Sequence, residues 1–183
     1  AVRWPGRITP GRVVDDFVSL TDLAPTFLEI AGIKPWPEMT GRSFVDVLLG
    51  KPSSAPRDCV FIERERHANV RHGDLSYPVR GIRTKDFLYL RNLRPDRWPS
   101  GDPELYFAVG PFGDVDGSRT KENILSNRES PQMKRFFDLN FGKRPAEELY
   151  DLAKDPDQIH NLAADPGYAQ AKSKLSARVD GWM

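Results

Sequence analysis

Proline and glycine interrupt this chain so often that it cannot be built from long helices. Its 183 residues include 16 prolines and 14 glycines. Proline ends helices and stays out of central strands, and both residues favour turns. We therefore predict short helices and strands joined by many loops. Hydrophobic residues make up 39% of the chain and charged residues 29%, and a chain of this length can bury a globular core.

The first part of the chain carries two helical patterns. One runs from about residue 22 to residue 31, with Pro25 in the first turn, where its missing N–H is not needed. The apolar residues of this helix share one face by their spacing, and we expect them to pack against an apolar surface: Leu23, Phe27 and Ile30. A shorter helix is predicted for residues 43–49, with Gly50 closing it.

The rest of the chain mixes strand and helix patterns. Four apolar stretches favour strands: residues 57–66, 77–83, 86–92 and 148–152. A tight turn at Thr84-Lys85 joins the second and third stretches into a predicted hairpin. Helices are predicted for residues 118–126, 131–139 and 165–179, and residues 105–109 fit either a strand or a short helix. The predicted strands are joined as hairpins and do not alternate with helices as in βαβ units. This order indicates the α+β class, with a small antiparallel sheet and helices on one face.

The overall charge gives the chain little attraction for nucleic acid or anionic lipid. The net charge is +1, and no RNA- or DNA-binding fingerprint is evident. Residues 64–97 hold nine basic against four acidic residues, a difference of +5, whereas residues 145–183 hold four against seven, a difference of −3. No apolar run reaches the roughly 18 residues of a membrane span, and no signal-peptide pattern opens the chain. We therefore expect neither a nucleic-acid nor a membrane partner.

The single cysteine limits the chemistry further. With only Cys59, no intrachain disulfide can form and a cysteine-based metal site is excluded. Cys59 lies in an apolar stretch, and we expect it to be buried in a strand. His67 and His72 are five residues apart with no third ligand at a fitting spacing, so we expect no metal site.

Two sequence motifs, one near the start of the chain and one near its end, resemble those of a known family. TDLAPTFLEIAG stands at residues 21–32, and ELYDLAKDP at residues 148–156 is followed by NLA at residues 161–163. In this order they resemble the C-terminal third of the sulfatase family, whose members remove sulfate from sulfated sugars and aryl sulfates. The middle phrases ERERH (63–67) and DLSYPVRGIRTKDF (74–87) look like the heparan N-sulfatase branch, the N-sulfoglucosamine sulfohydrolase-like members.

The resemblance implies a fold and a domain division. It implies a four-stranded antiparallel sheet with a long C-terminal helix packed across it, as in the C-terminal subdomain of sulfatases of the alkaline-phosphatase-like superfamily. Residues 1–50 would be the trailing edge of the N-terminal α/β domain, and residues 51–183 the C-terminal subdomain. The resemblance also suggests a periplasmic, extracellular or lysosomal location.

The resemblance further implies that the catalytic centre lies upstream. The family's nucleophile is a cysteine oxidised to formylglycine in a Cys-x-Pro-Ser-Arg setting, and Cys59, followed by Val60, Phe61 and Ile62, does not match it. The family's calcium ligands are Asp and Asn side chains of the missing portion. Calcium and formylglycine therefore belong to the full-length enzyme, and we expect no catalytic residue, no cofactor and no activity in this chain alone. Its partners would be the missing N-terminal domain and a sulfated saccharide.

A cluster of cations marks the candidate substrate site. Arg64, His67, Arg71 and His72 follow one another closely, and Arg80 comes shortly after. Arginine presents a fixed fork of donors that suits sulfate and carboxylate oxygens. In the family this stretch faces the active-site cleft, so His67 is expected to contact the substrate directly and the four other residues are expected to assist. For Arg80 a structural role is the alternative.

Two other interpretations remain open. The alternation of Glu and Arg over residues 63–66 is also typical of a solvated strand face with weak cross-strand ion pairs. The same cations could serve a non-catalytic binding module for anionic glycans. A Cys-x-Pro-Ser-Arg or Ser-x-Pro-Ser-Arg core upstream, with an Asp-Asp metal pair, would separate the enzyme from the binding module.

Overall fold

The structure is a computed structural model that describes residues 1–53, 55–104 and 110–183. The chain forms two compact units, Ala1–Val60 and Phe61–Met183. The domain division predicted at residues 50/51, with residues 1–50 as the edge of a neighbouring domain, stays a prediction. The stretch 105–109, predicted as strand or short helix, lies outside the described residues.

The first unit is helical and contains the first predicted helix at nearly its predicted bounds. A 3-10 turn, η1 (Leu20–Asp22), leads directly into α1 (Leu23–Ile30), and a short helix, α2 (Val45–Leu48), follows. Ser19 caps η1 in a capping box: its side chain accepts from a backbone N–H while Asp22 accepts from the Ser19 N–H. The capping residue is therefore Ser19, and Asp22, as N-cap of α1 itself, makes no side-chain cap hydrogen bond.

A buried ion pair holds the first unit together. Asp22 Oδ2 accepts a hydrogen bond from Arg57 Nη1 at 2.9 Å, and Asp22 Oδ1 accepts from the Arg42 backbone N–H at 2.8 Å. The other guanidinium nitrogen of Arg57 donates to the carbonyls of Arg42 and Ser43. Because both charges are buried and multiply bonded, the pair fixes the loop around residue 42 against the start of α1.

The prediction that Leu23, Phe27 and Ile30 pack against an apolar surface is wrong for this structure. Phe27 is 62% exposed and Ile30 is 42% exposed, while Leu23 is half-buried. Helix α1 instead buries Pro25 and Thr26. The Thr26 hydroxyl donates to the Asp22 carbonyl and accepts from the Phe44 N–H, so polar contacts to the preceding turn and to α2 decide which face is covered.

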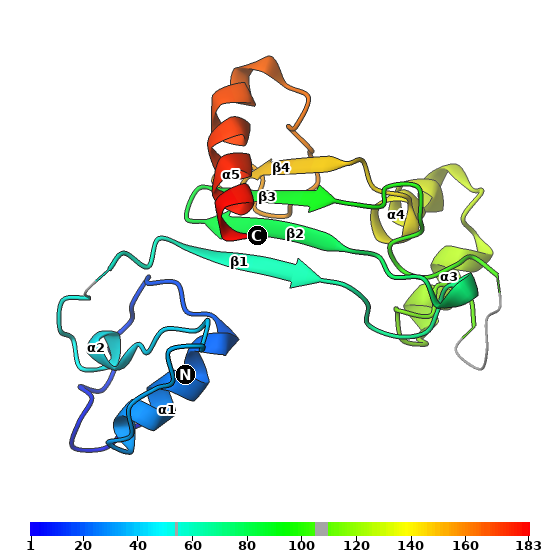
Figure 1. The fold of residues 1–183 in the computed structure, drawn as a ribbon. Coiled ribbons are helices and arrows are strands. Elements are labelled where there is room, and N and C mark those ends of the chain that lie inside the picture. Colours follow the sequence, from blue (N-terminus) through cyan, green and yellow to red (C-terminus); the bar gives the residue numbers. More distant parts are fainter. Residues whose placement is uncertain (54, 105–109) are drawn as a thin grey trace. The chain divides into compact units, whose positions relative to one another are not determined.

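The second unit is built on the predicted four-stranded sheet. The strands β1 (Cys59–Arg64), β2 (Val79–Thr84), β3 (Phe87–Asn92) and β4 (Glu147–Asp151) lie in the order β1-β2-β3-β4 (Figure 1). They start and end within two residues of the predicted bounds, and β2/β3 and β3/β4 are antiparallel. Cys59 at the start of β1 is half-buried rather than fully buried. The fold is α+β, as predicted.

Helix α5 (Ala169–Trp182) crosses the sheet and contacts β2 and β3 (Figure 1). Its buried residues are Leu175 and Val179, which are four positions apart and so share one face of the helix. At its end Trp182 stacks on Phe61 of β1, with ring centroids 4.9 Å apart. Aliphatic side chains thus pack the terminal helix against the sheet, and an aromatic pair holds the end of the helix against β1.

Helices α3 (Arg119–Ser126) and α4 (Pro131–Phe141) lie at the opposite end of the strands from α5 (Figure 1). Ser118 and Ser130 cap them through their side chains, and Pro131 occupies the first turn of α4. Phe112, Ile124 and Phe141 form the hydrophobic core of this end, and Phe112 is fully buried. This core anchors the loops that carry the candidate site.

Candidate functional site

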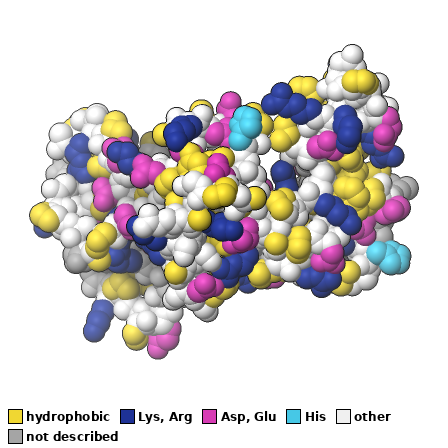
Figure 2. Space-filling model, turned by 90° about the horizontal axis from the view of Figure 1, so that it is seen from above, with side chains coloured by type: hydrophobic (Ala, Val, Ile, Leu, Met, Phe, Trp, Pro, Cys, Tyr) yellow, Lys and Arg dark blue, Asp and Glu magenta, His cyan; other side chains and the backbone are white. Residues whose placement is uncertain are grey.

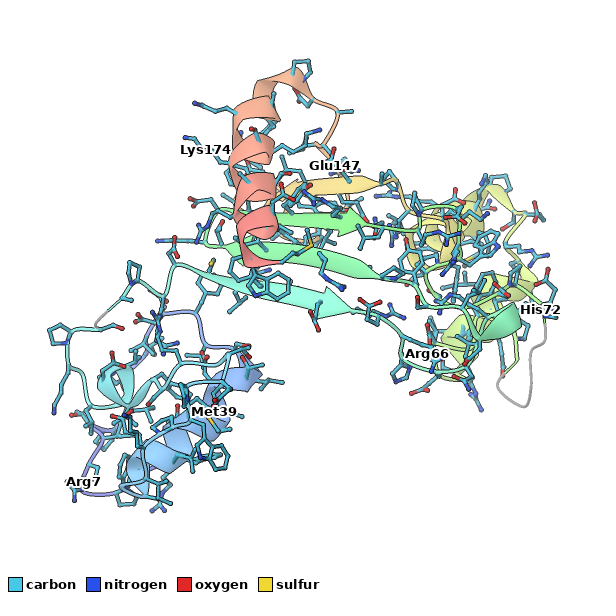
Figure 3. All side chains as sticks on the ribbon, in the orientation of Figure 1. Arg7, Met39, Arg66, His72, Glu147 and Lys174 are labelled. Carbon is cyan, nitrogen blue, oxygen red and sulfur yellow. The ribbon has the colours of Figure 1, made fainter. Side chains whose placement is uncertain are left out.

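Three of the predicted site residues, His67, Arg71 and His72, lie in the connection between β1 and β2, which includes a 3-10 turn, η2 (His72–Asp74). Arg64 is the last residue of β1, and Arg80 lies in β2. Arg66 and His72 of this connection lie at the α3/α4 end of the second unit, away from α5 (Figure 3). Two backbone hydrogen bonds tie the connection to distant segments: the Asp102 N–H donates to the Val70 carbonyl at 2.9 Å, and the Phe112 N–H donates to the Asp102 carbonyl at 2.8 Å. The loop is therefore held in place by the core around Phe112.

Gly101 shows how closely these segments approach one another. Its φ is +97°, and a Cβ atom there would lie 2.9 Å from the Gly113 nitrogen and 2.9 Å from Val70 Cγ2. Both the backbone conformation and the space exclude a side chain. Gly101 is therefore a crossing point of three segments under the site.

A buried carboxylate, Asp114, is the centre of the site. Its side chain is 3% exposed, and its Oδ2 accepts hydrogen bonds from Arg64 Nη2 at 2.7 Å and from Arg71 Nη2 at 3.0 Å. His67 Nδ1 lies 3.5 Å from the other oxygen, Oδ1. Three of the predicted site residues thus converge on one acidic residue that the sequence did not single out.

Arg71 supports the site from beneath. Its side chain is 1% exposed, and it donates to the carbonyls of Trp98 at 2.9 Å and Pro99 at 2.8 Å as well as to Asp114. Its guanidinium lies over the Tyr77 ring, 5.6 Å from the centroid. Burial, followed by the charge of Glu148, raises the pKa of Tyr77 to about 12, so the ring stays neutral next to this cation.

The predicted residues take different positions around an open hollow of about 540 Å³. Two of them, Arg64 and His67, line it together with four further residues: Glu63, Glu65, Arg66 and Asp114. Arg80 pairs with Glu65 instead. The backbone N–H of His72 donates to Asp102 Oδ2 at 2.7 Å. The structure therefore brings His67 and Arg64 to the hollow, with Arg71 below them.

The basic excess of residues 64–97 is largely taken up by internal ion pairs. Arg64 and Arg71 bind Asp114, Arg66 binds Asp74, and Arg80 binds Glu65. Across the face shown in Figure 2, Lys and Arg side chains lie interspersed with Asp and Glu. The His67 side chain is 69% exposed and that of Arg64 is 39% exposed. The hollow thus offers a few exposed donors beside carboxylate acceptors rather than a strongly cationic surface.

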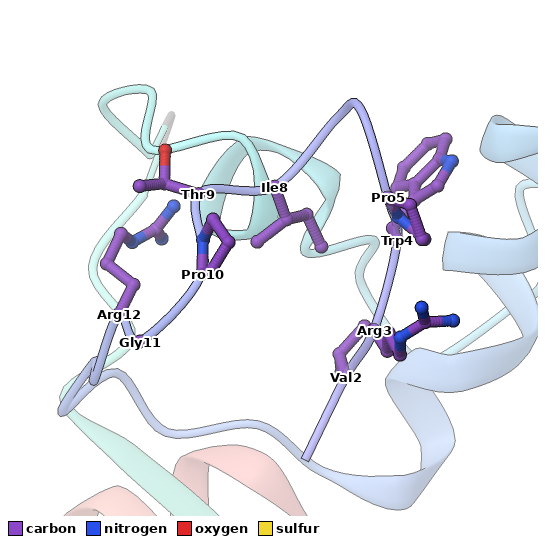
Figure 4. Close-up of a pocket in the computed structure, with 9 residues that line it drawn as sticks. All are labelled: Val2, Arg3, Trp4, Pro5, Ile8, Thr9, Pro10, Gly11 and Arg12. Carbon is purple, nitrogen blue, oxygen red and sulfur yellow. The ribbon is translucent and has the colours of Figure 1, made fainter.

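A second hollow, of about 410 Å³, lies in the first unit and is lined by residues 2–5 and 8–12 (Figure 4). Of its two arginines, Arg12 donates to the carbonyls of Leu48 and Val47. The described lining contains no carboxylate or imidazole. This hollow therefore supplies no group for acid–base chemistry.

The described residues show neither a metal cluster nor a membrane-spanning helix. Over residues 1–53, 55–104 and 110–183 there is no group of three or more His, Cys, Asp or Glu side chains that could hold a metal ion. Within those same ranges, no helix combines the length and apolarity needed to cross a membrane.

Comparison with known proteins identifies the family. Residues 1–101 match the family described as N-sulphoglucosamine sulphohydrolase, C-terminal. The chain belongs to this family. The resemblance read from the bracketing phrases is thereby confirmed as that of a sulfatase C-terminal portion.

Two curated relatives extend over nearly the whole chain. An ulvan-active sulfatase of Formosa agariphila is 31% identical over 99% of this chain and 32% of its own length. The human N-sulphoglucosamine sulphohydrolase is 29% identical over 98% of this chain and 37% of its own length. This sulfatase chain therefore spans about a third of the length of the curated relatives it matches.

A solved structure agrees with the fold. The phosphonate monoester hydrolase of Agrobacterium radiobacter superposes with a TM-score of 0.57 at 23% identity, over 93% of this chain and 26% of its own. Because a phosphonate monoester hydrolase has the same arrangement, the fold of this sulfatase chain does not specify the substrate.

Asp114 is the residue that sequence reasoning missed. It lies in a stretch rich in Gly, Pro and Asp that predicts loops, 50 positions from Arg64 and 43 from Arg71. Its only sequence signal is an acidic residue within that stretch, and loops are where binding groups concentrate. A contact over such a separation depends on how the loops fold back, which periodicity does not encode.

Proposed function

We propose that the full-length protein is a sulfatase that hydrolyses an N- or O-linked sulfate from a sulfated sugar, and that this chain contributes substrate recognition rather than the catalytic centre. Family membership supports the reaction class. The hollow around His67 and Arg64, with its buried anchor Asp114, is the observation that supports the role in recognition.

The chemistry of the hollow suits a sugar that carries both charge and hydroxyl groups. The exposed edge of Arg64 and the imidazole of His67 can donate to sulfate or carboxylate oxygens. The carboxylates of Glu63 and Glu65, which line the same hollow, can accept hydrogen bonds from sugar hydroxyls. Alternating donors and acceptors favour a saccharide over a simple inorganic anion.

Calcium and formylglycine are proposed only for the full-length enzyme. In sulfatases formylglycine supplies the nucleophile that attacks sulfur, and calcium neutralises the sulfate oxygens. The residues described here fit neither group: Cys59 lies at the start of strand β1 outside a Cys-x-Pro-Ser-Arg setting, and no described cluster has metal-ligand character. No step of the reaction is therefore assigned to a residue of this chain.

The test is sulfate release by the full-length protein. We expect release from an N-sulfated or an O-sulfated glucosamine saccharide, measured by ion chromatography, and comparison of the two substrates assigns the linkage. Absence of sulfate release from every sulfated saccharide, with retained binding of those saccharides, would favour a non-catalytic module for anionic glycans. An upstream Cys-x-Pro-Ser-Arg or Ser-x-Pro-Ser-Arg core would support the enzyme independently.

A further inference from the structure

The two oxygens of the Asp114 carboxylate have different partners. Oδ2 accepts from both Arg64 and Arg71, whereas Oδ1 is buried and has no hydrogen-bond partner among the described residues. A buried acceptor without a partner is costly, so an unused carboxylate oxygen in a folded protein calls for an explanation. His67 faces this oxygen, with its Nδ1 atom 3.5 Å from Oδ1.

The carboxylate itself is rigidly placed. The Asp114 backbone N–H donates to the Ser100 carbonyl at 3.0 Å, and the next residue, Val115, donates to the carbonyl of the fully buried Phe112. The two arginines bind Oδ2 from the side of β1 and the following loop. A carboxylate fixed by its backbone and by two guanidinium groups cannot turn Oδ1 away from His67.

His67, by contrast, has room to adjust. Its side chain is 69% exposed, and a separation of 3.5 Å is only slightly beyond the usual range of about 2.7–3.2 Å for an N–H···O bond. A small rotation of the ring closes this distance. When Nδ1 faces a carboxylate, the proton sits on Nδ1 and the opposite nitrogen, Nε2, is presented to whatever lies in front.

We propose that Asp114 is a positioning residue for substrate binding: held at Oδ2 by Arg64 and Arg71, it orients His67 through Oδ1 so that Nε2 faces the hollow and contacts the sulfated sugar. The contact with sugar rests on the function proposed above. The orientation of the ring does not, and it can be measured separately. In this arrangement Arg71, buried and remote from the ligand, acts on the substrate only through Asp114.

A double-mutant cycle on the full-length protein tests the coupling. We expect Asp114→Asn to lower kcat/KM for an N-sulfated glucosamine saccharide by roughly tenfold. In a His67→Ala background the same change should have little further effect, because the residue through which Asp114 acts is gone. Turnover of 4-nitrophenyl sulfate should change much less in every variant. Equal losses in both backgrounds, or equal losses on both substrates, would overturn the proposal and make Asp114 a structural support only.

The matched control is Asp96→Asn. Asp96 pairs with Arg94 and its side chain is 59% exposed, so the same loss of charge is made in a loop outside the hollow. We expect wild-type kcat/KM on both substrates. A tenfold loss of kcat/KM in Asp96→Asn as well would show that the assay responds to any loss of negative charge. The proposed coupling between Asp114 and His67 would then be overturned.

A spectroscopic measurement keeps the proposal testable if Asp114→Asn does not fold or if no saccharide is hydrolysed. In the full-length wild-type protein labelled with ¹⁵N-histidine, the His67 signal is identified by its absence in His67→Ala. At a pH where the ring is neutral, long-range ¹H–¹⁵N spectra should show the proton on Nδ1. A proton on Nε2 would overturn the proposed orientation, whatever the outcome of the activity assays.

Discussion

Asp114 shows how a few charged side chains can be arranged so that only one or two of them reach the solvent. Arg71 and Asp114 are buried beneath, and Arg64 and His67 share the same anion at the surface. Buried charges are tolerated when they are paired and hydrogen-bonded. The substrate contact proposed above would therefore fall to His67, with Arg64 beside it.

His67→Ala in the full-length enzyme should lower kcat/KM for a sulfated saccharide about ten- to a hundredfold, and much less for a small aryl sulfate. The loss corresponds to one charge-assisted hydrogen bond of roughly 1.5–3 kcal/mol. The aryl sulfate serves as the control because it lacks the sugar. Equal losses on both substrates would mean that His67 acts on the sulfate itself. No loss on either substrate would favour the other interpretation, in which this part of the chain is a solvated strand end without a role in recognition.

Arg71→Ala should destabilise the chain far more than Arg80→Ala. Removal of Arg71 leaves a buried carboxylate half-paired, the Trp98 carbonyl without its Arg71 donor and the Pro99 carbonyl with only the longer bond from Arg64 at 3.3 Å. This change costs about 3–5 kcal/mol. Arg80 pairs with Glu65, whose side chain is 53% exposed, and such a pair contributes under about 1 kcal/mol. Urea unfolding followed by circular dichroism measures both values, and similar losses would contradict the buried position of Arg71.

Among the elements, helix α1 is the one whose buried face differs from expectation. Phe27→Ala should cost under about 1 kcal/mol in this chain, because Phe27 is 62% exposed. The same change at the fully buried Phe112 should cost about 3–5 kcal/mol. The free energy of unfolding of both variants decides the matter, and a loss near 3 kcal/mol at Phe27 would show that the apolar face of α1 is covered in solution.

The sheet and α5 are joined by groups that respond to acid. The hydrogen bond from the Tyr89 hydroxyl, and then the contact with Lys172 of α5, lower the pKa of Glu147 below its usual value. A lowered folded-state pKa stabilises the fold above the unfolded pKa, near 4.5, and this contribution is lost as pH falls through the folded value. Glu147→Gln should therefore flatten the fall in Tm below about pH 4.5, whereas the exposed control Glu129→Gln should follow the wild type.

Local signals were sufficient for the elements and insufficient for their contacts. The cap at Ser130, the proline at Pro131 and the hairpin near Thr84 depend on neighbouring residues, so their boundaries could be predicted from the sequence. The buried face of α1 depends on Thr26 reaching Phe44, and the site depends on Asp114 reaching His67. These contacts join distant positions, and a single sequence has no periodic signal for them.

For the molecule as a whole, the chemistry and the recognition are proposed to lie on different parts of a longer chain. The 183-residue chain alone should hydrolyse neither 4-nitrophenyl sulfate nor sulfated glucosamine, with or without added calcium. Sulfate release above the level of a heat-denatured control is the measurement. Calcium-dependent turnover by the isolated chain would contradict the proposal and place a catalytic centre within it.

The crossing at Gly101 has a practical meaning for redesign. No side chain fits at Gly101, and the backbone of Asp114 is hydrogen-bonded to the neighbouring Ser100. Substitutions in these segments beneath the hollow would therefore disturb the position of Asp114. Under the proposed function, freedom to alter specificity would lie in the exposed rim residues Glu63, Glu65 and Arg66. A library that randomises this rim and leaves Gly101 untouched would explore new sulfated sugars without losing the scaffold, whereas one that includes Gly101 would consist largely of misfolded members.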